Sequence, residues 1–137
     1  MNKETTSFSW ISGANERLSS AVNLAEKIHE GQFDKLGIPY INHVKEVADR
    51  VSEYGEDYII VGLLHDSVED TDITLEDIEA KFGRAIRDGV DGMTKREGED
   101  YFDDYLPRVT LNELSRRVKV ADSSHNLSKN HGAVPVN

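Results

Sequence analysis

The segment GLLHDSVEDT, residues 62–71, constrains the fold more than any other part of this sequence. Residues three and four apart share one face of an α-helix. At 100° per residue, one imidazole and three carboxylates of this segment fall within an arc of roughly 140°. These polar side chains are those of His65, Asp66, Glu69 and Asp70. The opposite side of the helix carries the apolar residues Ile60, Val61, Leu64 and Val68. The segment therefore predicts an amphipathic helix over about residues 56–69, with a buried apolar face and an acidic polar face.

This polar face has two interpretations. Divalent cations such as Mn²⁺ bind mixed sets of imidazole nitrogen and carboxylate oxygen, and additional carboxylates can handle the proton of a metal-bound water. However, an acidic face on an amphipathic helix is often only solvated, and a surface histidine needs no metal. The segment alone leaves both interpretations open, so other candidate ligands are needed to separate them.

Composition limits the class of protein. A chain of 137 residues fits one domain, which we expect to span residues 1–137. The formal net charge of −10 argues against nonspecific binding to nucleic acid or to anionic membranes. The absence of cysteine excludes disulfides and thiolate zinc sites. No apolar run approaches the ~20 residues needed to span a bilayer, and the N-terminus has no signal-peptide core, so we expect a cytoplasmic protein.

The hydrophobic pattern is helical along most of the chain. Apolar residues recur at helical spacing, and no alternation persists long enough to indicate a sheet. Helices are expected over about 14–30, 41–53, 56–69, 74–83 and 84–93, from 100 with an interruption near Pro107, and from 110 onwards. Thr74 with Asp77, and Thr110 with Glu113, are spaced as capping boxes. Residues 128–137 show no helical pattern. The sequence therefore predicts an all-α bundle of six to seven helices.

Two further residues have the chemistry of metal ligands. His43 lies in the first turn of the expected helix 41–53, beside Val44 and Val47, where it could equally be a packed core histidine. Asp122 follows Val118 and Lys119, and could equally be an exposed carboxylate or pair with that lysine. We expect His125 to be a surface residue.

Together these segments resemble a known family. GQFDKLGIPYINH, GLLHDSVEDT, FG, VDGMTK and VKVADSSHN occur in the order typical of HD-domain metal-dependent phosphohydrolases. The sequence resembles most the (p)ppGpp hydrolase domain of RelA/SpoT homologues and the small alarmone hydrolases, over about residues 18–127. HD alone is a weak motif, whereas the ordered set of five segments is specific. The resemblance implies the HD-domain helical bundle, and it favours the metal-site interpretation.

The resemblance also implies roles for individual residues. One Mn²⁺ per chain would be bound by His43, His65, Asp66 and Asp122. Glu69 and Asp70 would be the catalytic carboxylates beside the metal-bound water. Lys35, Lys95 and Asn126 match positions that bind the nucleotide or its phosphates, although exposed loop lysines are also common without such a role. The implied activity is guanosine-3′,5′-bis(diphosphate) 3′-pyrophosphohydrolysis, with a small phosphorylated nucleotide as substrate.

The sequence departs from the family pattern in three places. Asp34 stands where the alarmone hydrolases usually have an arginine that contributes to the nucleotide site, and Ser123 replaces another usual arginine. The sequence also ends soon after Asn126, where family members continue with helices that help to close the substrate pocket. Two alternatives follow: an HD phosphohydrolase acting on another phosphorylated nucleotide, or a noncatalytic metal- or nucleotide-binding module. The sequence does not give the oligomeric state.

Overall fold

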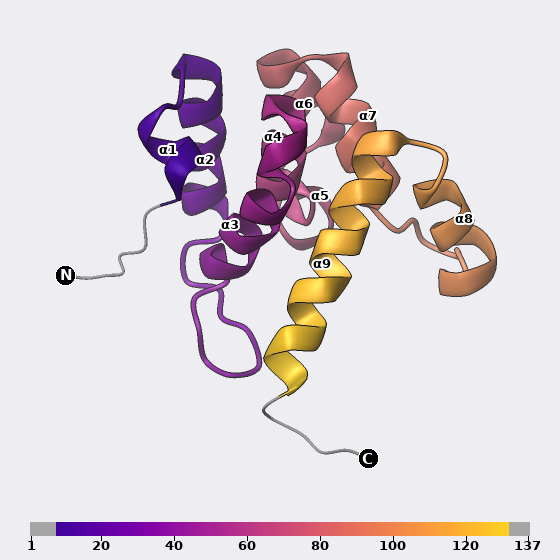
Figure 1. Cartoon of the computed structure of the whole chain (residues 1–137). Coiled ribbons are helices and arrows are strands. Elements are labelled where there is room, and N and C mark those ends of the chain that lie inside the picture. The colour runs from indigo at the N-terminus through magenta and orange to yellow at the C-terminus, as the bar shows by residue number, and fades with distance from the viewer. Residues whose placement is uncertain (1–7, 132–137) are drawn as a thin grey trace.

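The computed structural model describes residues 8–131, and within them the secondary structure is helical apart from one isolated β-bridge between Phe33 and Pro39 (Figure 1). Six α-helices have eight or more residues, in agreement with the predicted all-α bundle. A 3₁₀ turn, η1 (Ser52–Tyr54), and a π-helical turn, η2 (Tyr101–Tyr105), complete the described elements. The α-helices are α1 (Ser9–Ser12), α2 (Glu16–Ile28), α3 (Ile41–Arg50), α4 (Glu56–Leu64), α5 (Ser67–Asp70), α6 (Leu75–Phe82), α7 (Arg84–Met93), α8 (Leu106–Val109) and α9 (Glu113–His131). None of the helices described is long and apolar enough to cross a bilayer.

Helix α4 is the centre of the bundle, in contact with α2, α3, α7 and α9 (Figure 1). Its residues 59–64 are all buried, so this part of the helix has no polar face toward solvent. The predicted continuous amphipathic helix over 56–69 is therefore wrong. Helix α4 ends at Leu64, and the backbone of Asp66 has φ −100° and ψ 3° before α5 begins. Neighbouring helices cover α4 on several sides. The polar residues of the 62–71 segment therefore lie together only after the helix ends.

A close approach between α3 and α4 depends on Gly62. A Cβ atom at this position would lie 2.8 Å from the Cα of Ala48 and 3.1 Å from its backbone nitrogen. Backbone atoms cannot rotate away as a flexible side chain can, so the two helices would have to separate. Helix α3 carries His43, and His65 and Asp66 follow directly after α4, so the spacing of the two helices matters to the site as well as to the core.

We expect Gly62→Ala to destabilise the protein by about 1–3 kcal/mol, the usual cost of overpacking a core. Alanine is the better helix former by up to about 1 kcal/mol, so only the steric clash explains a loss. Thermal unfolding followed by circular dichroism measures the effect. Gly13→Ala is the matched control, because a Cβ there would meet no atom within 4 Å. An unchanged or higher melting temperature for Gly62→Ala would contradict the close-contact argument.

The helix ends were predicted with mixed success. The capping box of Thr74 and Asp77 is confirmed. The predicted box of Thr110 and Glu113 is wrong: Asn112 Oδ1 accepts the Ser115 amide at 3.0 Å, and the Thr110 hydroxyl donates to the Pro107 carbonyl. Asparagine is itself a preferred N-cap, and it lies directly before α9.

Two other boundaries also differ from the sequence-based expectation. Pro107 does not interrupt a helix: η2 continues directly into α8, and Pro107 lies in the first turn of α8. The expectation of no helix from residue 128 is wrong for residues 128–131, because α9 continues to His131. The rest of that expectation, residues 132–137, lies outside the described residues.

Candidate active site

Four side chains from three parts of the chain converge in the bundle. Their candidate ligand atoms all lie within 4.8 Å of one another. His43 comes from α3, Asp122 comes from α9, and His65 and Asp66 come from the turn after α4. Both imidazoles are buried, and Asp122 is only 8% exposed. The structure thus brings together all four residues that the sequence analysis named as metal ligands.

The hydrogen bonding of His65 tests whether this cluster suits a cation. Its Nδ1 lies 2.7 Å from the Gly62 carbonyl oxygen, which can only accept, so Nδ1 carries the proton. In the neutral ring Nε2 then has a free lone pair, and it makes no hydrogen bond among the described residues. It faces Asp66 Oδ2 at 3.1 Å and Asp122 Oδ1 at 3.4 Å. These three atoms are all acceptors, so their close approach requires a positive charge between them. With the imidazole of His43 the cluster offers two nitrogens and two carboxylates, a set that suits a divalent metal.

Without such a cation, protons have to balance the cluster. Burial works against the imidazolium of His65, but Asp66 and Asp122 raise its pKa well above the usual value. Burial also works against the charge of Asp66, yet His65 and Tyr40 lower the pKa of that carboxyl to about 2. Burial works against the charge of Asp122 too, but hydrogen bonds from His43 and His65 lower its pKa, so both carboxylates stay ionised, as metal ligands must be.

His43 is oriented from both ring nitrogens. Nε2 lies 2.8 Å from Asp122 Oδ1, and Nδ1 lies 2.8 Å from Nδ1 of His125. The rings of His43 and His125 also stack, with centroids 5.1 Å apart. The expectation that His125 is a surface residue is therefore incomplete, because its partly buried ring fixes that of His43. Partners of this kind hold a metal-binding imidazole in one tautomer and orientation.

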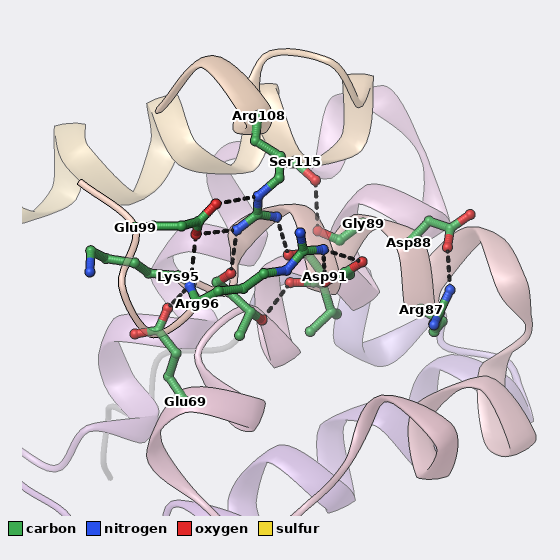
Figure 2. Close-up of polar contacts among 12 residues, drawn as sticks. Glu69, Arg87, Asp88, Gly89, Asp91, Lys95, Arg96, Glu99, Arg108 and Ser115 are labelled. Carbon is green, nitrogen blue, oxygen red and sulfur yellow. Dashed lines mark hydrogen bonds and ion pairs between the residues drawn. The ribbon is translucent and has the colours of Figure 1, made fainter. Parts of the chain in front are cut away.

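Glu69 and Asp70 lie on the short helix α5, directly after the metal-ligand candidates. Glu69 Oε2 accepts the backbone amide of Lys95 at 2.6 Å (Figure 2). Burial raises the pKa of Glu69, although that hydrogen bond opposes the shift. Burial and the charge of Asp66 also raise the pKa of Asp70. A carboxylate with a raised pKa is a better proton acceptor near neutral pH than an ordinary one.

A small pocket of about 120 Å³ contains Glu69 together with Asp66 and Asp122, two of the four candidate metal ligands. The pocket is lined by Asp66, Glu69, Met93, Lys95, Tyr101, Tyr105, Lys119 and Asp122. Asp70 is not part of this lining, so the two carboxylates that the sequence treats as a pair have different surroundings. Lys95, which the resemblance assigns to phosphate binding, also lines this pocket.

Arg108 holds the loop that carries Lys95 (Figure 2). Its guanidinium donates to both carboxylate oxygens of Glu99, at 2.8 and 2.7 Å. It also donates to the carbonyl oxygens of Asp91 at 3.1 Å and Thr94 at 2.8 Å at the end of α7, and the Asp91 carbonyl accepts the Thr94 amide as well. One arginine thus connects α7, α8 and the loop whose amide contacts Glu69.

The hydrogen bonds from Arg108 lower the pKa of Glu99 to about 2, from an ordinary 4.5. The folded protein therefore binds this proton less readily than the unfolded chain. The stabilisation is complete above about pH 4.5 and is lost as the pH falls toward 2. We expect the melting temperature of wild type to exceed that of Glu99→Gln at neutral pH, and the difference to shrink over this interval. A difference that is constant with pH would contradict the ion-pair assignment.

Lys35 and Asn126 lie on a second and larger groove, of about 600 Å³. It is lined by Phe33, Asp34, Lys35, Leu36, Tyr40, Asn126 and Lys129. Asn126 connects this groove to the candidate metal ligands, because its amide nitrogen lies 3.4 Å from Asp122 Oδ1. The candidate substrate residues are thus divided between the groove and the pocket. The four candidate metal ligands lie between these two sites.

Asp34 is part of the loop rather than a free charge in this groove. Its Oδ1 accepts the amides of Leu36 at 2.8 Å and Ile38 at 3.0 Å, and its Oδ2 pairs with Lys129 of α9 at 3.0 Å. Hydrogen bonds from these partners lower the pKa of Asp34. The residue that departs from the family pattern thus builds the loop and ties it to α9.

Three residues beside the candidate metal ligands were not predicted as functional from the sequence, although Lys119 was considered there as a partner of Asp122. The Tyr40 hydroxyl donates to Asp66, His125 contacts His43, and the Lys119 ammonium lies 3.5 Å from Asp122 Oδ2. For two of them a signal was present, because residues three apart share a helix face: Lys119 and His125 lie three residues before and after Asp122. Tyr40 gave no comparable signal.

A family model described as HD domain matches residues 21–128. The chain belongs to the HD-domain family. Two relatives share 38% identity with it. The guanosine-3′,5′-bis(diphosphate) 3′-pyrophosphohydrolase of Aquifex aeolicus aligns over 75% of the chain, which spans 17% of that protein. The 3′-pyrophosphohydrolase MESH1 of Danio rerio aligns over 80% of the chain, which spans 67% of that protein.

A solved structure agrees with the assignment to the HD-domain family. It is that of a metazoan orthologue of SpoT, described as hydrolysing ppGpp. It matches with a TM-score of 0.76 at 26% identity, over 90% of this chain and 75% of that one. The predicted HD-domain bundle, and the resemblance to RelA/SpoT homologues, are confirmed.

Proposed function

We propose that this HD-domain protein is a metal-dependent (p)ppGpp 3′-pyrophosphohydrolase. The observation that carries the proposal is the convergence of two buried imidazoles and two carboxylates beside Glu69. The names of the relatives from Aquifex aeolicus and Danio rerio support the substrate. A small phosphorylated nucleotide would bind along the pocket and the groove, which lie on either side of the candidate metal ligands.

His43, His65, Asp66 and Asp122 would hold one divalent cation, which we propose to be Mn²⁺. When bound, such a cation lowers the pKa of a water ligand and offsets charge on phosphoryl oxygens. Imidazole nitrogen and carboxylate oxygen suit Mn²⁺, and the set lacks the thiolates that select softer metals. The manganese cofactor and the cytoplasmic location are predictions that rest on the sequence.

The residues of the chain would then carry out the proton transfers. Glu69, held by the Lys95 amide and with a raised pKa, would take the proton from the attacking water. Water adds to the phosphorus attached to the 3′ oxygen, and the bond between that oxygen and phosphorus breaks. The 3′ oxygen takes up a proton, and pyrophosphate is released with GDP or GTP. Asp70 would relay protons between this site and solvent.

Lys35, Lys95 and Asn126 would bind the nucleotide or its phosphates. Lys35 and Asn126 line the larger groove, and Lys95 lines the pocket beside Glu69. The structure of the 33–38 loop favours keeping a second candidate, hydrolysis of another phosphorylated nucleotide. Asp34 cannot supply the guanidinium that the alarmone hydrolases use at this position, and its carboxylate is already engaged.

The test is a product assay with purified protein and Mn²⁺ against ppGpp and other 3′-phosphorylated nucleotides. We expect ppGpp to yield GDP and pyrophosphate, and Lys35→Glu to raise its KM. Asp34→Asn, which keeps an acceptor for the loop amides but removes the charge, separates charge from loop structure. Cleavage of a different nucleotide in preference to ppGpp would favour the second candidate. Failure to cleave any of them with metal bound would defeat the hydrolase proposal, leaving a noncatalytic binding module.

A further inference from the structure

Lys119 is a fixed cation at the pocket beside Glu69, and the mechanism above gives it no role. Its Nζ lies 5.3 Å from the ring centroids of both Tyr101 and Tyr105. Its side chain is only 18% exposed, whereas Lys95 lies on an exposed loop. A lysine normally keeps its ammonium in water, so this one is held at the pocket by specific contacts.

The contacts come from the π-helical turn η2. The Tyr105 amide donates to the Asp100 carbonyl at 2.9 Å, which is the i to i+5 bond of such a turn. Tyr105 is buried, and its hydroxyl donates to the Met93 carbonyl at 2.6 Å. The ring of Tyr101 lies 5.3 Å from that of Tyr105. The two rings form a platform that attracts a cation through their faces and keeps the ammonium of Lys119 in place.

The charges around the pocket explain why a fixed cation is useful there. Three carboxylates line it, from Asp66, Glu69 and Asp122, against two lysines. A divalent ion would offset two of the three negative charges, and the lysines would then make the pocket attractive to an anion. The chain as a whole carries a net charge of −10, so the wider field repels a polyphosphate. Local cations must supply the attraction, and Lys119 is the one whose position is set in advance.

We propose that Lys119 is a diphosphate-binding residue, whose ammonium contacts the 3′-diphosphate of the substrate and the pyrophosphate released from it. This inference rests on the proposed function for the identity of the substrate. The ammonium would attract the charge on the phosphoryl oxygens as the bond to the 3′ oxygen breaks. Tyr101 and Tyr105 act through Lys119 and are positioning residues.

Inorganic pyrophosphate is the probe, titrated by calorimetry into the 137-residue chain saturated with Mn²⁺. We expect Lys119→Gln to weaken pyrophosphate binding by about 10- to 100-fold, the usual effect of losing a charged hydrogen bond. The KM for ppGpp should rise as well. Lys119→Arg, which keeps the charge, should recover most of the affinity. Lys81→Gln on α6 makes the same chemical change at an exposed position and should leave binding unchanged.

Two further measurements separate ligand binding from a structural role. If Lys119 only balances the charge of Asp122, Lys119→Gln will change the Mn²⁺ affinity or the melting temperature, and the metal-saturated protein will bind pyrophosphate as wild type does. That result overturns the proposal, even if wild type hydrolyses ppGpp. If wild type cleaves no nucleotide but binds pyrophosphate in a Lys119-dependent way, the proposed function fails and the diphosphate site stands.

Discussion

Replacing Glu69 with glutamine is expected to lower kcat for ppGpp hydrolysis by about 10²–10⁴-fold, the usual contribution of a general acid or base. Glutamine keeps the shape of the side chain and an oxygen that can accept the Lys95 amide, but it cannot take up a proton near neutral pH. Glu69 is not among the convergent metal-ligand candidates, so Mn²⁺ affinity should stay close to that of wild type. Steady-state kinetics and metal titration on the same preparation test both parts.

The control for this variant is Glu53→Gln, the same chemical change at an exposed position on η1. It should have wild-type kinetics. Near-normal turnover in Glu69→Gln would remove Glu69 from the mechanism. Loss of Mn²⁺ binding together with turnover would instead place Glu69 among the metal ligands.

Replacing Asp122 with alanine is expected to abolish retention of Mn²⁺ at stoichiometric metal and to lower hydrolysis by more than about 10²-fold. Loss of a residue that only supports a metal ligand already costs roughly 10–100-fold in affinity or activity, and Asp122 is proposed as a ligand itself. Its Oδ1 lies within 3.4 Å of both His43 Nε2 and His65 Nε2, so the variant also disturbs the orientation of the two imidazoles. Electron paramagnetic resonance of free Mn²⁺ measures retention directly.

Asp122→Asn is the conservative companion, because it keeps the volume of the side chain and removes only the charge. It should fold like wild type and still lose metal. Asp72→Ala, at an exposed position between α5 and α6, is the control and should bind metal normally. Full metal occupancy in both Asp122 variants would defeat the four-ligand assignment.

Local sequence patterns determined the helices well where the signal lies within one helical turn. The spacing of apolar residues predicted α7 with its observed bounds, and it placed α2 within two residues at each end. The capping box of Thr74 and Asp77 could be predicted from four consecutive residues, whereas the same spacing at Thr110 and Glu113 was misleading because Asn112 caps α9 instead. The ordered motifs also predicted the four candidate metal ligands that converge in the structure, because the type of side chain at each position is a property of the sequence itself.

Only the tertiary structure decided how those donors meet and what surrounds them. His43 and Asp122 are 79 residues apart in the sequence, and no local pattern relates their positions. The break after α4 has the same origin: α2, α3, α7 and α9 pack against α4, so burial overrides the amphipathic pattern that local spacing predicts. The sequence by itself determined which side chains could bind a metal and which segments are helical, because both depend on residue type and near neighbours. Packing decided which partners hold those side chains in place, because such contacts join helices that are distant in the sequence.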